Sequence, residues 1–111
     1  MDYMILIYQD ATAANMPADA PISEPWMVYT KALIQAGVMV GGSRLAPSAT
    51  ATTLHVRDGK RQVQDGPYAD TKEQLAGYYI IRTPDLDTAL DWAARCPGAL
   101  NGKLEVRPLA G

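Results

Sequence analysis

The sequence predicts an α+β domain of the ferredoxin-like type, β-α-β-β-α-β with an inserted β-hairpin, and residues 1–111 are expected to form a single domain. Two observations support this prediction. Four segments with strand patterning and two stretches of helical periodicity follow one another in the order that the fold requires. Between the two halves, Asp58-Gly59 separates two extended runs, which is a strong signal for a tight hairpin turn. We expect a largely antiparallel sheet with both helices on one face.

The first half of the chain predicts a strand, a helix and a second strand. Residues 3–8, YMILIY, are an apolar run of strand length, and residues 10–22 have the composition of a loop. A helix is expected over 23–37, because Ser, Glu and Pro stand at its start, apolar residues recur at helical spacing, and Gly stands at its end. Residues 38–45, VMVGGSRL, predict the second strand, in which the Gly-Gly pair indicates a bulge or a close backbone approach.

The second half predicts a hairpin over 52–64 and a closing strand over 103–108, which alternates polar and apolar residues. Residues 77–82, GYYIIR, predict another strand, and a helix opened by Thr-Pro-Asp is expected over 83–96 before Pro-Gly ends it. The stretch 65–76 joins a turn, DGP, to two overlapping capping-box patterns. We therefore expect a stub helix there, ended by the glycine that follows.

The predicted strands over residues 3–8 and 77–82 are apolar on both faces. Successive strand residues point to opposite sides of a sheet, yet in YMILIY and GYYIIR both sets are dominated by apolar side chains. Two helices can cover one face, and an exposed apolar patch of the size left on the other face is rare in monomers. We therefore predict a homodimer in which the two sheets pack face to face.

Composition and charge limit the partners and cofactors. The formal net charge is −2, the sequence has no Lys/Arg cluster, and no apolar run approaches the roughly 20 residues of a membrane span, so neither nucleic acid nor membrane binding is expected. No secretory signal opens the chain, and we predict a cytoplasmic protein. His55 and Cys96 are the only His and Cys, which argues against a metal site within one chain. Nucleotide-binding glycine motifs are absent, so no cofactor is expected.

The stretch DGPYADTKEQLAGYYII, residues 65–81, resembles the central motif of the YCII-related family in its DGPF-domain branch. YMILIY, TATTLHVRDGK, LDTALDWAARCP and LEVRP are similar to that family too, so the resemblance covers almost the whole chain. It implies a dimeric α+β barrel, in agreement with the dimer predicted from the two-faced strands. It also implies an alternative role, as a non-catalytic partner in an extracytoplasmic-function sigma-factor pathway.

The chain departs from the family pattern at informative positions. Tyr68 stands where the branch has Phe, and Asp70 and Ala76 replace Glu and Gly. The resemblance implies a His–Asp pair in the YCII branch proper, with the Asp before a proline that follows the second helix. Here that dipeptide is Cys96-Pro97, and the first helix contains no His, so the pair is not carried over.

The candidate site residues each have a structural alternative. The catalytic candidates are Asp65 and His55, and the ligand-binding candidates are Arg44, Asp65, Tyr68, Lys72 and Tyr79. Asp65 can instead fix the turn, His55 can be a half-buried hydrogen-bonding residue, and Arg44 can form a surface ion pair. Cys96 is expected to be an inert thiol, and both Trp residues are expected in the core or an interface.

Three hypotheses for function remain open from the residues. The first is a homodimer that binds a small molecule near the DGPY motif, or a metal-independent enzyme acting there by proton transfer. The second is the regulatory or accessory partner, and the third is an interaction scaffold. A pocket with converging polar groups favours the first hypothesis, whereas a packed interior with an exposed apolar patch favours the other two.

Overall fold

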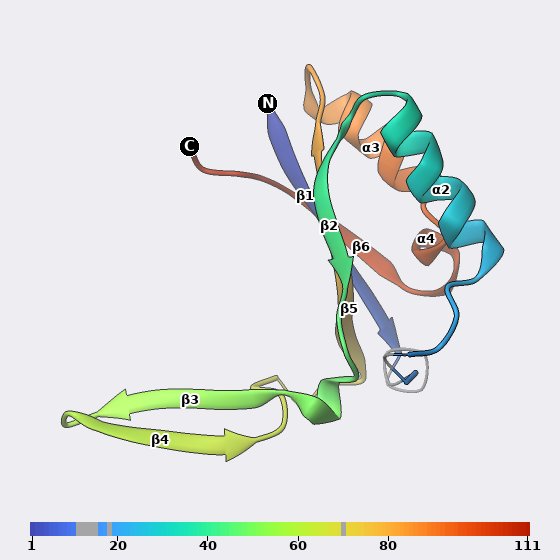
Figure 1. Ribbon diagram of the computed structural model, residues 1–111. Coiled ribbons are helices and arrows are strands. Elements are labelled where there is room, and N and C mark those ends of the chain that lie inside the picture. The colour runs from blue at the N-terminus through green and yellow to red at the C-terminus, as the bar shows by residue number, and fades with distance from the viewer. Residues whose placement is uncertain (11–15, 18, 70) are drawn as a thin grey trace.

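The computed structural model in Figure 1 describes residues 1–10, 16–17, 19–69 and 71–111, and it confirms the α+β fold class. The elements are β1 (Asp2–Asp10), α2 (Glu24–Gln35), β2 (Met39–Arg44), the 3₁₀ turn η1 (Ser48–Thr50), β3 (Thr52–Arg57), β4 (Lys60–Asp65), β5 (Glu73–Arg82), α3 (Leu86–Ala94), α4 (Gly98–Asn101) and β6 (Lys103–Pro108). One sheet has the strand order β2-β5-β1-β6, with antiparallel neighbours, and β3 and β4 form a separate two-stranded ladder. This strand order is that of the ferredoxin-like arrangement.

The core lies between the sheet and the two longer helices, which Figure 1 shows on the same side. Tyr3, Ile5 and Ile7 of β1 are buried against this side, as alternation along a strand requires. Leu33 of α2 and Ala89 of α3 are fully buried opposite them. The helical periodicity of the sequence therefore identified the packed face of α2. Of the four apolar positions at helical spacing in α3, Ala89 and Ala93 are buried, whereas Leu86 and Leu90 are 45% exposed.

The opposite face of the sheet is apolar and only half covered. Met4, Leu6 and Tyr8 of β1 point to it, and Met4 and Leu6 pair in register with Ile80 and Tyr78 of β5. All five are of intermediate exposure. In the described part of the chain, both long helices lie on the other side of the sheet (Figure 1). We refer to this surface as the open face.

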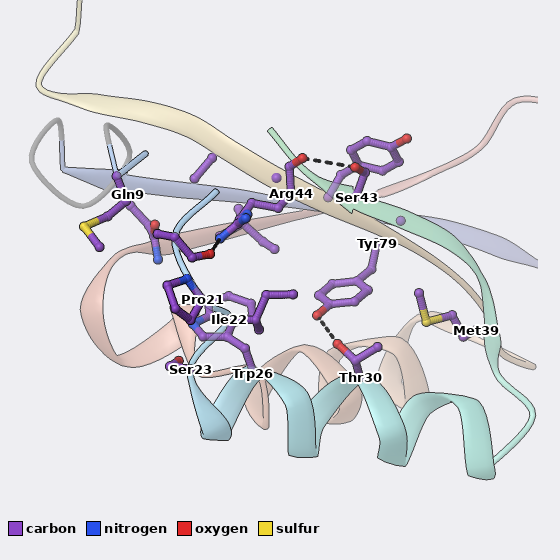
Figure 2. Close-up of a pocket in the computed structure, with 17 residues that line it drawn as sticks. Gln9, Pro21, Ile22, Ser23, Trp26, Thr30, Met39, Ser43, Arg44 and Tyr79 are labelled. Carbon is purple, nitrogen blue, oxygen red and sulfur yellow. Dashed lines mark hydrogen bonds between the residues drawn. The ribbon is translucent and has the colours of Figure 1, made fainter. Parts of the chain in front are cut away.

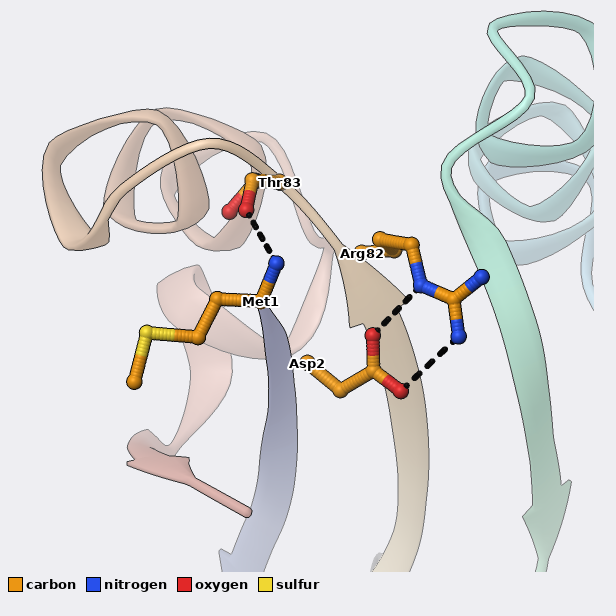
Figure 3. Close-up of polar contacts among 4 residues, drawn as sticks. All are labelled: Met1, Asp2, Arg82 and Thr83. Carbon is orange, nitrogen blue, oxygen red and sulfur yellow. Dashed lines mark hydrogen bonds and ion pairs between the residues drawn. The ribbon is translucent and has the colours of Figure 1, made fainter. Parts of the chain in front are cut away.

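Polar contacts fasten β1 to the end of β5 (Figure 3). The Met1 ammonium donates to the Thr83 carbonyl over 3.1 Å, and Arg82 contacts both carboxylate oxygens of Asp2, at 2.7 and 3.2 Å. The hydrogen bonds from Arg82 lower the pKa of Asp2 below its usual range. The pair is exposed to solvent, so it fixes geometry more than it adds stability.

The expected stub helix before β5 is wrong. From Glu73 onward the backbone pairs with β1, so the segment gains sheet hydrogen bonds that a two-turn helix could not replace. The Thr71 hydroxyl donates to the carbonyl of Glu73 instead of capping a helix, and the Gln74 amide donates to the Thr71 carbonyl over 2.6 Å. The other capping pattern begins at Asp70, which lies outside the described residues.

The two expected helices form with small differences at their ends. Ser23 stands at the N-cap of α2 without a side-chain cap bond, and Gly37 follows the helix with φ of +73°. Asp85 caps α3 by accepting from the Thr88 amide over 2.8 Å, so this helix begins three residues later than expected. After Pro97, one turn of helix, α4, forms that the sequence did not predict.

The predicted hairpin forms and stands apart from the sheet. Asp58 and Gly59 have φ of +54° and +73°, the two positive values of a tight hairpin turn. Figure 1 shows β3 and β4 extending from one end of the sheet, on the side opposite the helices. None of the described helices is both long and apolar enough to cross a membrane.

Candidate functional site

A pocket of about 470 Å³ opens between α2 and the β2 end of the sheet. Its walls are the first half of α2, the segment before it, and parts of β1, β2 and β5, as Figure 2 shows. The volume is in the range of small-molecule sites. Trp26 of α2 and Tyr79 of β5 provide aromatic surface, and Ile22 and Met39 add aliphatic surface.

Two hydroxyl groups meet at one side of this pocket. Thr30 Oγ1 and the Tyr79 hydroxyl are 2.7 Å apart, and Figure 2 shows them joining α2 to the sheet. The Tyr79 ring also packs edge-on against Tyr29, with centroids 5.5 Å apart and planes at 79°. Tyr29 is in turn held by donation to the Trp92 carbonyl over 2.8 Å. Tyr79 is therefore held from two directions.

The local environment keeps Tyr79 a neutral phenol. Burial raises its pKa, and the hydrogen bond with Thr30 offsets part of that rise. A neutral phenol has both a proton to donate and lone pairs to accept, so the pair can bind either a carbonyl or a hydroxyl group. Deprotonation of Tyr79 near neutral pH is opposed by its surroundings.

Arg44 contributes the charged group of the pocket. Among the described lining residues, it is the one with a formal charge. Its Nη1 donates to the Ala20 carbonyl over 2.9 Å, which ties the segment before α2 to the end of β2. Figure 2 shows the guanidinium near Pro21, at the opposite side of the pocket from Thr30. The pocket therefore has a polar group at each side and an apolar middle.

Two glycines let the neighbouring strands form the floor of the pocket. A Cβ on Gly42 would lie 2.7 Å from the Tyr78 carbonyl oxygen, and a Cβ on Gly77 would lie 2.9 Å from that of Ser43. Contacts this short with backbone atoms cannot be relieved by a side-chain rotation. The expected close approach at Gly41-Gly42 is confirmed, together with a register shift between Met39 and Gly41. Gly77 serves the same strand pair and does not end a helix.

The family assignment follows from comparison with known proteins. The family model described as YCII-related domain matches residues 1–110. The chain belongs to the YCII-related family. An uncharacterized protein of Rhizobium meliloti (strain 1021) is 37% identical to it, over 99% of this chain and 93% of the relative.

The structure separates the predicted site residues of this YCII-related chain into two groups. Arg44 and Tyr79 line the pocket. Asp65 ends β4, His55 lies in β3 on the hairpin, and Tyr68 and Lys72 lie between β4 and β5. These four are exposed, Tyr68 by 91%, and none is among the described lining residues. The pocket described above therefore includes neither the DGPY motif nor the hairpin.

Sequence reasoning missed Thr30 and assigned Trp26 only to a core or interface. The signal for both was their spacing, because residues four apart on a helix share a face and Trp26 begins the apolar stripe of α2. A threonine beside that stripe, facing the sheet, is a polar exception that marks a candidate contact. Gln9 and Ser43, also in the lining, carried no such signal.

Metal and thiol chemistry have little geometric support in the described part of the chain. The described residues contain no group of three His, Cys, Asp or Glu side chains placed to hold a metal ion. Cys96 is buried, and burial raises the pKa of its thiol to about 11. This agrees with the expected inert thiol, since the thiolate is the nucleophilic form.

Proposed function

We propose that this YCII-related protein is a homodimer that binds a small molecule in the pocket between α2 and the sheet. Any reaction there is proposed to be a proton transfer without metal or nucleotide. One observation carries the proposal. The Thr30–Tyr79 hydroxyl pair and Arg44 converge on an otherwise largely apolar space of about 470 Å³.

The arrangement of the pocket favours an amphipathic ligand. Its aromatic and aliphatic walls suit an apolar body, and its two polar sides suit polar groups at the ends of such a molecule. Tyr79 as a neutral phenol can donate to a ligand carbonyl, and Arg44 can donate to a carboxylate or other oxygen. The ligand class proposed is therefore a small organic molecule with oxygen functions at both ends.

A fragment screen tests the binding proposal. Saturation-transfer NMR of the wild-type protein against small amphipathic acids, ketones and phenols is expected to give binders. Thr30→Val keeps the shape of the side chain and removes its hydroxyl, so it should weaken such binders by about threefold to tenfold, the effect of one hydrogen bond. His55→Ala is the matched control, since its side chain lies on the hairpin, outside the pocket lining.

If wild type and Thr30→Val bind the fragments equally, and His55→Ala or Asp65→Asn loses that binding, the site lies on the hairpin and the proposed pocket site is wrong. If no fragment binds at all, the accessory role in a sigma-factor pathway becomes the better proposal.

The dimer is supported by the open face. Half-exposed apolar residues on two central strands are an unusual outer surface for a monomer and a common inner surface for packed sheets. Sedimentation at micromolar concentration should give twice the chain mass of 12.0 kDa. A species of 12.0 kDa under these conditions would contradict the dimer.

A further inference from the structure

The β3–β4 hairpin is an amphipathic arm. Leu54 pairs directly with Val63 in the ladder, and Val56 lies two residues from Leu54, so the three share one face. They are 54%, 59% and 56% exposed, respectively. The other face pairs His55 with Gln62, and its remaining members are also polar. One face of the arm thus carries three uncovered apolar side chains, next to Arg61, which pairs with Val56, whereas the other face is polar throughout.

Such an arm needs a surface to pack on. A two-stranded hairpin by itself is at best marginally stable in water. Two hydrogen bonds close its base. The Gly66 backbone N–H donates to the Ala51 carbonyl over 2.7 Å, and the Thr53 hydroxyl donates to the Gly66 carbonyl over 2.9 Å. Beyond the base, nearly every residue of both strands is exposed. The radius of gyration, 15.6 Å, exceeds the roughly 13 Å of a compact chain of this length, as a projecting arm requires.

The direction of the arm identifies its occupant. Figure 1 shows it leaving the sheet on the side of the open face, away from α2 and α3. Six residues per strand give a length of about 20 Å, and two packed sheets are about 10 Å apart. An arm of this length reaches past a second sheet laid on the open face. The open face and the arm together form an angled surface, which a second copy related by a two-fold axis can fill reciprocally.

Charge also favours a second copy. Of the ten Lys and Arg residues, three lie in 52–65, whereas only two of the twelve Asp and Glu residues do. The rest of the chain therefore carries seven positive and ten negative side chains, and a weakly basic arm projects from an acidic body. Arm and body of two copies attract each other, which suits the arm to a copy of its own chain.

We propose that the β3–β4 hairpin of each chain clasps the second copy of the dimer, with Leu54, Val56 and Val63 packed against it. The proposal rests on the dimer proposed above. It assigns an interaction surface to the part of the chain between the two halves of the fold. It also brings Asp65 and Tyr68, at the base of the arm, next to the interface.

Variants on the two faces of the arm test the clasp. Leu54→Thr, Val56→Thr and Val63→Thr combined place β-branched residues at all three positions, which suits a strand, and remove the apolar side chains of this face. This triple variant should raise the dimer dissociation constant in sedimentation about tenfold or more. The matched control, His55→Thr with Gln62→Thr, changes the opposite face at one ladder pair and should leave the constant within about twofold.

Two further measurements keep the proposal falsifiable if the triple variant misfolds. The arm can be removed by joining Ala51 to Gly66 through a short Gly-Ser linker, because their backbones are already hydrogen-bonded. This deletion should also weaken the dimer about tenfold or more. In the wild type, hydrogen exchange of amides 52–65 should slow as the concentration rises through the dissociation constant.

The outcomes separate the clasp from the dimer itself. A wild-type protein that is monomeric overturns both. A stable dimer whose constant is unchanged by the triple variant and by the deletion overturns the clasp and leaves the sheet-to-sheet dimer. Fast exchange of the arm in a fully formed dimer would likewise overturn the clasp and assign the arm to a different partner.

Discussion

Removing the bond between Thr30 and Tyr79 should reveal a measurable coupling between α2 and β5. The two hydroxyl oxygens are 2.7 Å apart, and Tyr79 is 8% exposed. A neutral hydrogen bond of this kind contributes about 0.5–1.5 kcal/mol to the free energy of unfolding. Thr30→Val and Tyr79→Phe should therefore each lower that free energy by about 1 kcal/mol. The double variant should lose about the same amount, because both substitutions remove one interaction.

The assay is urea unfolding of the four proteins, with the free energies compared in a double-mutant cycle. For a domain of this size a loss of 1 kcal/mol also lowers the melting temperature by about 4 °C. Tyr68→Phe is the matched control, because it removes the hydroxyl of a tyrosine that is 91% exposed and should change stability by less than about 0.5 kcal/mol. If the losses of the two single variants add in the double variant, the two residues do not interact directly and the reasoning fails.

Three further substitutions give distinct expectations. Gly77→Ala places a Cβ 2.9 Å from the Ser43 carbonyl oxygen, so it should destabilise the protein by about 1–3 kcal/mol in thermal unfolding, and a wild-type melting temperature would contradict the close approach. The pKa of Cys96 is raised to about 11 in the folded protein, so the thiol loses its proton at lower pH in the unfolded state, and the free energy of unfolding should fall as the pH rises from about 9 to 11. Cys96→Ala should flatten that fall, and an unchanged slope in the variant would refute the assignment to Cys96. Asp65→Asn at the exposed end of β4 should change the free energy of unfolding by less than about 0.5 kcal/mol, and a larger loss would show that its carboxylate fixes the turn.

The sequence predicted most of the fold because its apolar periodicities are strong. YMILIY alternates between two apolar sets, and the structure buries one set under the helices and leaves the other on the open face. Asp58-Gly59 supplied the two positive φ values of the hairpin turn. The stub helix failed because capping patterns describe local preference, whereas pairing of Glu73 and Gln74 with β1 is a long-range interaction.

The candidate site was predicted less completely. Arg44 was chosen because it follows the Gly-Gly pair, where a bulge can redirect side chains, and Tyr79 was chosen as an aromatic residue of the strand after the DGPY motif. Both line the pocket. Thr30 escaped notice because its partner is 49 residues away in the sequence. Asp65, Tyr68 and Lys72 were chosen from the most distinctive motif, and in the structure that motif forms the exit of the hairpin and the start of β5. The sequence of a motif does not by itself indicate which of its side chains face a cavity.

The most direct test of the pocket uses the two tryptophans of the chain. Trp26 lines the pocket, whereas Trp92 lies in α3. The Arg95 guanidinium carbon stacks over the Trp92 ring, 4.3 Å from the centroid of that ring. In ¹⁵N-labelled protein the two indole N–H signals can be assigned with Trp92→Phe and followed while a screened fragment is added. Binding in the pocket predicts a saturable shift of the Trp26 signal and a constant Trp92 signal. Fragments that bind yet leave the Trp26 signal unmoved would contradict the assignment of the site.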